Sequence, residues 1–301
     1  MYVVTGATGN TGHVVAQKLL VNGQKVRTVG RSADRLQAIA AEGAEPFVAD
    51  LIDKQALTKA FTGARAVYAM VPPPSANAQD YRAYQDRISD AIAAALSAAK
   101  VPYAVTLSSF GADKPDKTGP VVGLHNLEQK LNKITGLNVL HLRPGYFMEN
   151  TFSQIDIIQA MGITAGPLRP DLKLPMIAAR DIGAAAAEEL LKLGFQQKQT
   201  RELLGQRDLT MTEVTATIGK AIGKPGVVYK QLPDEQVRAA MVQMGMSLDM
   251  ANLILEMAAA LNSGHMRTLE PRSPRNTTPT SYEVFVAEQF VPLYQRKTRA
   301  A

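Results

Sequence analysis

Three glycines close to the N-terminus are the residues whose spacing most clearly points to chemistry. They belong to the segment Gly6-Ala7-Thr8-Gly9-Asn10-Thr11-Gly12, which directly follows the apolar run Tyr2-Val3-Val4-Thr5. In a strand-turn-helix unit, Gly6 permits the tight turn, Gly9 lets the backbone approach a pyrophosphate, and Gly12 lets the helix pack on the strand. The helix start adds free N–H groups that favour phosphates. The segment therefore predicts a dinucleotide-binding loop; its spacing is G-x-x-G-x-x-G, and a merely tight turn is the alternative.

The residues after the second predicted strand indicate which dinucleotide would bind. A site for NAD(H) usually places an acid about 20 residues beyond the glycines, where it bonds the ribose 2′-hydroxyl. This sequence reads Val29-Gly30-Arg31-Ser32 there and has no acid before Asp34. Arg31 offers a planar, permanently charged group to a 2′-phosphate, with Ser32 as a second donor. We therefore predict NADP(H) rather than NAD(H); a solvated surface arginine is the alternative reading of Arg31.

These loops need a scaffold, and the first half of the chain has the pattern of a parallel sheet covered by helices on both faces. Short β-rich runs alternate with amphipathic or alanine-rich stretches up to about residue 142. The predicted strands are Met1–Thr5, Lys25–Gly30, Ala44–Val48, Ala66–Val71, Val101–Leu107 and Leu137–Leu142. The predicted helices are Asn10–Leu20, Ala33–Ala41, Lys54–Phe61, Ala78–Ala99 and Leu124–Ile134. The predicted fold is α/β, a Rossmann-type doubly wound parallel sheet.

The rhythm changes after about residue 145, where Met and Pro become more frequent and helical patterns lengthen. We predict a dinucleotide-binding domain at 1–150 and a smaller, mostly helical substrate region at 151–301. Only two strands are expected in the second half, near Thr200–Leu204 and Val227–Lys230. Asp181-Ile182-Gly183 predicts a capped helix, so that about 177–200 rejoins the sheet.

Helix starts and the end of the chain carry further local signals. Thr210–Glu213 and Thr280–Glu283 both fit the capping box, in which a hydroxyl and an acid three residues later satisfy the first N–H groups of a helix. The basic tail from about Arg296 is expected to be disordered.

Composition limits the classes of function. The 301 residues include no cysteine, which excludes disulfides and thiolate sites, and they carry a net charge of +6. The basic residues are scattered, so we expect no nucleic-acid partner and read a solvated surface that suits a phosphate-bearing ligand. No signal-peptide pattern and no run of about 20 apolar residues occurs, so we expect a cytoplasmic protein without a membrane partner. We also expect no metal site, and either a monomer or a homodimer.

Several motifs together resemble those of the NmrA-like branch of the atypical short-chain dehydrogenases. They are the glycine segment, the block His141-Leu142-Arg143-Pro144-Gly145-Tyr146-Phe147-Met148-Glu149-Asn150, Asp181-Ile182-Gly183, and Pro279-Thr280-Ser281-Tyr282-Glu283-Val284-Phe285. The resemblance spans nearly the whole chain. It implies a Rossmann-type sheet, a small C-terminal region and a cleft between them. Members include NADPH-dependent reductases of quinones and dyes, and regulators that bind the dinucleotide without turning it over.

The resemblance also implies which residues follow the cofactor along the carboxyl ends of the strands. Asp50 and Leu51 would lie beside the adenine. The residues on the way to the nicotinamide would be Met70, Val71, Pro72, Ser108 and Ser109. Those that flank the nicotinamide would be Pro144, Gly145, Tyr146 and Phe147. Simpler roles are open for three residues: Asp50 and Asn150 could cap helices, and Phe147 could belong to the core.

The usual catalytic pair of short-chain dehydrogenases is absent. Those enzymes use a Tyr with a Lys four residues later, and none of the nine tyrosines here has Lys at that spacing. The corresponding helix instead carries His125 and Gln129. We take His125 as the candidate acid, with a positioning role equally open, and Lys130 as a possible cofactor contact.

Two functions fit this sequence. The first is an NADPH-dependent oxidoreductase that sends hydride to a small, apolar acceptor such as a quinone, because a reduced quinone can take its proton from solvent. The second is a non-catalytic NADP(H) sensor that acts through a protein partner. An open, apolar cleft at the nicotinamide end would favour the enzyme.

Overall fold

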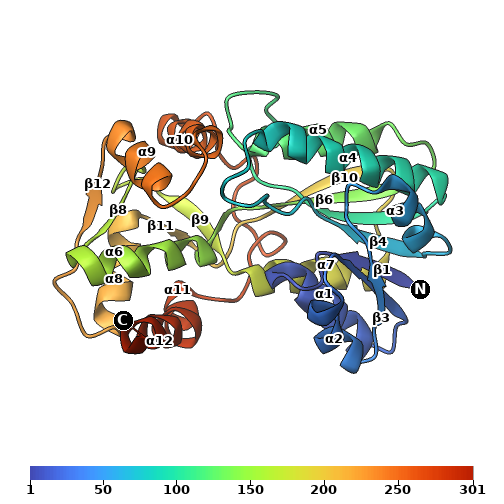
Figure 1. Ribbon diagram of the computed structural model, residues 1–301, viewed down its shortest axis with the longest axis horizontal. Coiled ribbons are helices and arrows are strands. Elements are labelled where there is room, and N and C mark those ends of the chain that lie inside the picture. Colours follow the sequence, from blue (N-terminus) through green and yellow to red (C-terminus); the bar gives the residue numbers. More distant parts are fainter. Residues whose placement is uncertain (301) are drawn as a thin grey trace.

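The computed structural model describes residues 1–300, and its larger part is a seven-stranded parallel sheet (Figure 1). The strand order is β10-β6-β5-β4-β1-β2-β3, and every neighbouring pair runs parallel. The strands are β1 (Tyr2–Thr5), β2 (Val26–Gly30), β3 (Glu45–Val48), β4 (Ala66–Ala69), β5 (Tyr103–Leu107), β6 (Asn138–Pro144) and β10 (Lys198–Leu203). The chain order reverses between β1 and β4, where a parallel sheet leaves a crevice at its carboxyl edge.

Helices cover both faces of this sheet, as the alternating pattern predicts (Figure 1). One face carries α1 (Asn10–Val21), α2 (Ala33–Ala41) and α7 (Ala179–Lys192). The other carries α3 (Lys54–Phe61), α4 (Tyr81–Ala98) and α5 (Val121–Asn132). Val3 and Val4 are both fully buried and belong to the two different cores, because successive residues of a strand point to opposite faces. The predicted doubly wound α/β fold is confirmed.

Local capping sets where several helices begin. Asp53 accepts hydrogen bonds from Gln55 N and Ala56 N, and thereby caps α3. Asp80 accepts from Ala83 N at 2.9 Å, which makes α4 begin at Tyr81, later than the sequence predicts. The predicted bounds of α2 and α3 coincide with the observed ones.

The smaller region contains more strands than the sequence predicts. It holds β7 (Tyr146–Phe147), β8 (Thr164–Gly166), β9 (Leu174–Ile177), β11 (Asp208–Leu209) and β12 (Tyr229–Gln231), in the small sheets β11-β9-β7 and β12-β8. The expectation of two strands after residue 145 is therefore wrong, because strands of two to four residues are too short to show a hydrophobic period. The helical segments are η1 (Met148–Ser153), α6 (Gln154–Met161), α8 (Met211–Ala221), α9 (Asp234–Gln243), α10 (Leu248–Ser263), α11 (Tyr282–Phe285), η2 (Val286–Phe290) and α12 (Val291–Ala300).

The chain returns to the large sheet through α7 (Ala179–Lys192) and β10, which ends at Leu203; the sequence places this return at about 177–200. The sequence predicts that Asp181 caps α7, and this is wrong. Ala178 holds the cap position, and Asp181 lies in the first turn of the helix. Its carboxylate accepts hydrogen bonds from Thr280 N at 3.0 Å and Thr280 Oγ1 at 2.7 Å. This contact joins α7 to the segment before α11.

The two predicted capping boxes have different outcomes. Thr210 and Glu213 form the full reciprocal box at α8, which is confirmed. Thr280 does not cap α11, because its hydroxyl is used by Asp181; Ser281 caps the helix instead and accepts from Val284 N.

The predicted disorder of the basic tail is also wrong as far as Ala300, since α12 extends to that residue. Lys297 Nζ lies 2.7 Å from Asp156 Oδ1 on α6, and Gln159 donates to Thr298 Oγ1 at 2.9 Å. These contacts hold the last turns of α12 against α6.

Across residues 1–300, none of the helices combines the length and the apolar character that crossing a membrane requires.

Candidate functional site

A cleft of about 750 Å³ opens at the carboxyl edge of the large sheet, between β1, β4 and β5 on one side and the smaller region on the other. Most residues predicted for the site line it. They are Gly6, Thr8, Gly9, Asn10, Thr11, Arg31, Ser32, Asp50, Leu51, Met70, Val71, Pro72, Ser108, Ser109, Gly145, Tyr146 and Phe147. The structure does not bring Gly12, His125, Lys130 or Pro144 to the lining.

The glycine loop joins β1 to α1 in a tight turn. Gly6 has φ +66°, a conformation that favours glycine, and Gly9 N donates to Gly6 O at 2.9 Å. A Cβ on Gly12 would lie 2.3 Å from Gly6 O, so Gly12 acts through packing and not as a lining residue. Helix α1 has no side-chain cap and no acid in its first turn. Its free N–H groups and partial positive charge are therefore available to an anionic ligand.

Buried hydroxyls fix this loop against β4. Thr5 Oγ1 donates to Tyr68 O at 3.2 Å and accepts from Met70 N at 3.1 Å. The Tyr68 hydroxyl donates to Thr11 Oγ1 at 3.0 Å. The turn is thereby held in place by two neighbouring strands.

Two arginines, and not one, lie where β2 ends. Arg31 and Arg35 both line the cleft, and one guanidinium N–H of Arg35 donates to Thr8 O at 3.3 Å. Ser32 also lines the cleft, while its hydroxyl accepts from Arg35 N and caps α2. The sequence prediction missed Arg35, although a second arginine four residues after the first, at a helix start, was a visible signal.

The next strand end adds an acid and a tyrosine. Asp50 Oδ1 accepts from Ile52 N at 3.2 Å, and Asp53 caps the following helix, so Asp50 lines the cleft without capping. Tyr84 on α4, which the prediction also missed, lines the same end. Burial raises the pKa of Tyr84; nearby Arg31 lowers that pKa and nearby Asp50 raises it. All three side chains line this end of the cleft.

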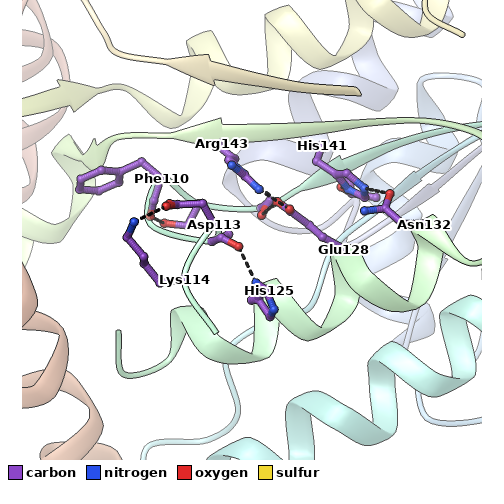
Figure 2. A network of polar contacts seen from close by, with 12 residues as sticks. Phe110, Asp113, Lys114, His125, Glu128, Asn132, His141 and Arg143 are labelled. Atoms are coloured by element: carbon purple, nitrogen blue, oxygen red, sulfur yellow. Dashed lines mark hydrogen bonds and ion pairs between the residues drawn. The ribbon is translucent and has the colours of Figure 1, made fainter. Parts of the chain in front are cut away.

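A buried polar network lies next to the cleft, where β5, α5 and β6 meet (Figure 2). The Ser108 hydroxyl donates to Glu128 Oε1 at 2.5 Å, and Arg143 donates to both Glu128 oxygens at 2.9 and 2.5 Å. Glu128 is 1% exposed. The single proton of Ser108 is committed to Glu128 Oε1, an oxygen that also accepts from Arg143. Ser108 can therefore accept a hydrogen bond in the cleft but has no proton to give.

A second buried group lies beside this network. His141 contacts Thr106 Oγ1 at 2.7 Å through Nδ1 and Asn132 Oδ1 at 3.1 Å through Nε2 (Figure 2). Burial lowers the pKa of His141 to about 4, with Arg143 acting in the same direction and Glu128 against it. The ring is therefore neutral at pH 7 and serves the fold rather than the cleft.

His125 and Lys130 on α5 are engaged elsewhere. His125 Nδ1 lies 2.8 Å from Ala112 O (Figure 2). Lys130 Nζ pairs with Asp86 at 3.0 Å and Asp90 at 2.8 Å, both on α4. Leu124 lines the cleft, and each later residue of α5 is turned by about 100° around the helix axis. His125 and Lys130 therefore lie on other faces of α5 than the one that lines the cleft.

The other end of the cleft is apolar. It is lined by Phe110, Leu124, Met257, Leu261 and Met266, four of which belong to or pack against the core of the smaller region. Met257 on α10 lines the cleft, whereas Met244, just after α9, is 73% exposed.

Helix α10 carries Met257 and Leu261 of this apolar wall. Two carboxylates of the same helix attach it to the large sheet. Asp249 accepts from Tyr81 N at 2.8 Å, at the start of α4. Glu256 accepts from Arg82 at 3.1 Å and from Gly119 N at 3.2 Å. A further bond joins Ser247 N to Ala76 O at 2.8 Å, in the loop after β4. The wall is thus fixed to the rim of the large sheet.

Within the described part of the chain, no three His, Cys, Asp or Glu side chains gather in a way that could hold a metal ion.

Comparison with known proteins gives one relative in sequence and two solved structures of similar fold. Quinone oxidoreductase 2 of Escherichia coli (strain K12) is 29% identical over 269 residues, which are 88% of this chain and 89% of that protein. The structure of Citrobacter sp. triphenylmethane reductase complexed with NADP(H) matches with a TM-score of 0.78 at 20% identity, over 95% of this chain and 100% of that one. The structure of NmrA, a negative transcriptional regulator, matches with a TM-score of 0.67 at 19% identity, over 99% and 98% of the two chains.

A family model decides which group these similarities define. The model of the NmrA-like family matches residues 2–283, which include the glycine loop, the network under Ser108 and the whole cleft. The chain belongs to the NmrA-like family.

Proposed function

We propose that this protein is an NADPH-dependent oxidoreductase that reduces a small, flat, apolar acceptor such as a quinone. The observation that carries the proposal is one continuous cleft with two different ends. One end is lined by the glycine loop and two arginines and is called the phosphate-binding end after its proposed ligand; the other end is apolar. The relative that is a quinone oxidoreductase, at 29% identity over 88% of this chain, supports it.

The residues of the first end fit the proposed cofactor. The glycine loop and the uncapped start of α1 would hold the pyrophosphate. Arg31 and Arg35 would hold a 2′-phosphate, with Ser32 beside them, and Tyr84 and Asp50 would lie near the adenosine. When bound, the reduced nicotinamide supplies a hydride.

The second end suits the proposed acceptor. Its aliphatic, thioether and aromatic side chains exclude water and carry no acid or base with a full charge. An acceptor without localised charge is therefore favoured. The protein's main task is to align this acceptor and to keep competing water away.

The sensor alternative receives less support. A regulator has no need of a pocket beyond the dinucleotide, whereas here the apolar end is open to the same cleft. The resemblance to NmrA is one of fold, at 19% identity.

The test is NADPH oxidation by purified protein, followed by nicotinamide absorbance, against a panel of quinones and dyes. We expect saturable turnover with one acceptor class and its loss in Arg31→Ala at limiting NADPH. The matched control is Arg299→Ala, near the end of α12, which should change nothing. Tight NADPH binding without reduction of any acceptor would favour the sensor.

A further inference from the structure

The two ends of the cleft differ in their titratable groups. Arg31, Arg35, Asp50 and Tyr84 line the phosphate-binding end. Among the described residues that line the cleft, the apolar end contains a single titratable side chain, that of Tyr146.

The position of Tyr146 is built into the fold. It lies on β7, directly after β6, and pairs in parallel register with Met176 on β9. Its ring is half-buried and packs against the same core that contains Phe110, Leu261 and Met266. A side chain on a paired strand keeps its direction better than one on a loop.

The phenol of Tyr146 is a hydrogen-bond donor and not a base. Burial raises its pKa, and the nearby Asn150 side chain acts against that rise. The hydroxyl therefore stays protonated at neutral pH. A protonated phenol can donate its proton to an acceptor in the cleft, which Tyr146 lines.

Several other donors near this end are already committed, while the Asn150 amide also lines the cleft. The Ser108 hydroxyl donates to Glu128, and His125 contacts Ala112 O. The neighbouring tyrosines are also engaged: Tyr229 donates to Leu168 O at 2.9 Å, and Tyr282 donates to Thr151 Oγ1 at 3.1 Å.

We propose that the Tyr146 hydroxyl donates a hydrogen bond to the carbonyl oxygen of the acceptor, and so stabilises the negative charge that develops there. This inference rests on the proposed function. The quinone accepts a hydride from NADPH, which leaves as NADP⁺, and becomes the monoanion of the hydroquinone. One proton from solvent completes the product, so Tyr146 keeps its own. A fixed donor in an apolar pocket is effective because no water competes for the oxyanion.

The first test compares two acceptors in Tyr146→Phe, which keeps the ring and its packing. With a quinone we expect kcat to fall roughly 10- to 100-fold, somewhat less than for a fixed oxyanion donor elsewhere because a quinone spreads its charge. With a cationic triarylmethane dye the hydride adds to carbon and no oxyanion forms, so kcat should stay within about twofold of the wild-type value.

The matched control is Tyr229→Phe, a tyrosine of the same region whose hydroxyl donates to Leu168 O and which does not line the cleft. It should leave both reactions unchanged. Equal slowing of quinone and dye by Tyr146→Phe, or no slowing of either, overturns the inference. Wild-type protein that reduces neither acceptor overturns the proposed function itself.

A second readout needs no turnover. Calorimetry on protein saturated with NADP⁺ compares α-tetralone with tetralin, which has the same carbon skeleton without the carbonyl. We expect Tyr146→Phe to weaken tetralone binding several-fold and to leave tetralin binding unchanged. If both ligands lose affinity equally, the side chain acts through packing and the inference is wrong.

Discussion

At the scale of single residues, recognition of the proposed cofactor depends on a pair of guanidinium groups. Arg31, which follows β2, and Arg35, on the first turn of α2, both line the cleft. Each would give a charge-assisted hydrogen bond to a 2′-phosphate that NADH lacks. We expect Arg31→Ala and Arg35→Ala each to weaken NADPH binding about tenfold while NADH affinity changes less than twofold. Fluorescence titration of both nucleotides measures this, and an equal loss for NADPH and NADH would contradict the assignment.

His141 gives a residue-scale prediction about pH. Its pKa is lowered to about 4 in the folded protein and is about 6.5 when unfolded, so the unfolded state binds more protons between these values. The free energy of unfolding must therefore fall as the pH drops below 6.5, by about 2 kcal/mol at pH 5. Urea unfolding at pH 8 and pH 5 should show this loss. In His141→Gln most of the difference between the two pH values should disappear; an unchanged difference would point to another group.

At the scale of elements, the sequence predicts what depends on neighbouring residues. The glycine loop, the bounds of α2 and α3 and the capping box of α8 follow from local patterns and are observed. The placement of His125 does not, because one residue's shift around α5 decides whether a side chain meets the cleft. Asp181 was expected as a cap because its partner Thr280, 99 residues away, could not be known from the sequence.

The packing of α7 on α1 gives a prediction at this scale. A Cβ on Gly183 would lie 2.7 Å from both Thr11 O and Val14 Cβ. An alanine in a helix interior is normally favoured over glycine by about 1 kcal/mol. Here Gly183→Ala should instead lower the free energy of unfolding by roughly 1–3 kcal/mol, since α7 must move away from α1. Thermal unfolding measures the change, and a variant more stable than wild type would show that the two helices separate without cost.

At the scale of the whole molecule, the cleft joins two cores whose side chains are far apart in the sequence. The glycine loop and the strand ends come from residues 6–145, while the apolar wall comes largely from α10 and Met266. The sequence predicts the first part through its motifs. It could not predict the second, because apolar residues at helical spacing look the same whether they line a cleft or fill a core.

The attachment of α10 therefore controls the acceptor end more than the cofactor end. Asp249 and Glu256 accept hydrogen bonds from Tyr81 N, Arg82 and Gly119 N, on the side of the large sheet. In the double variant Asp249→Asn/Glu256→Gln these bonds weaken, and Met257 and Leu261 lose their fixed position. We expect the KM for the acceptor to rise roughly three- to tenfold, because each charged hydrogen bond contributes about 1.5–3 kcal/mol and solvent screens the exposed ones.

NADPH affinity distinguishes this local effect from a general loosening. The glycine loop and Arg31 make no contact with Asp249 or Glu256, so the dissociation constant for NADPH should stay within about twofold. Glu188→Gln, which removes an exposed pair with Lys192 on the outer side of α7, is the control and should change neither value. A loss of NADPH affinity as large as the rise in the acceptor KM would contradict this prediction. It would mean that α10 couples the two ends of the cleft, so that its attachment positions the residues around both ligands.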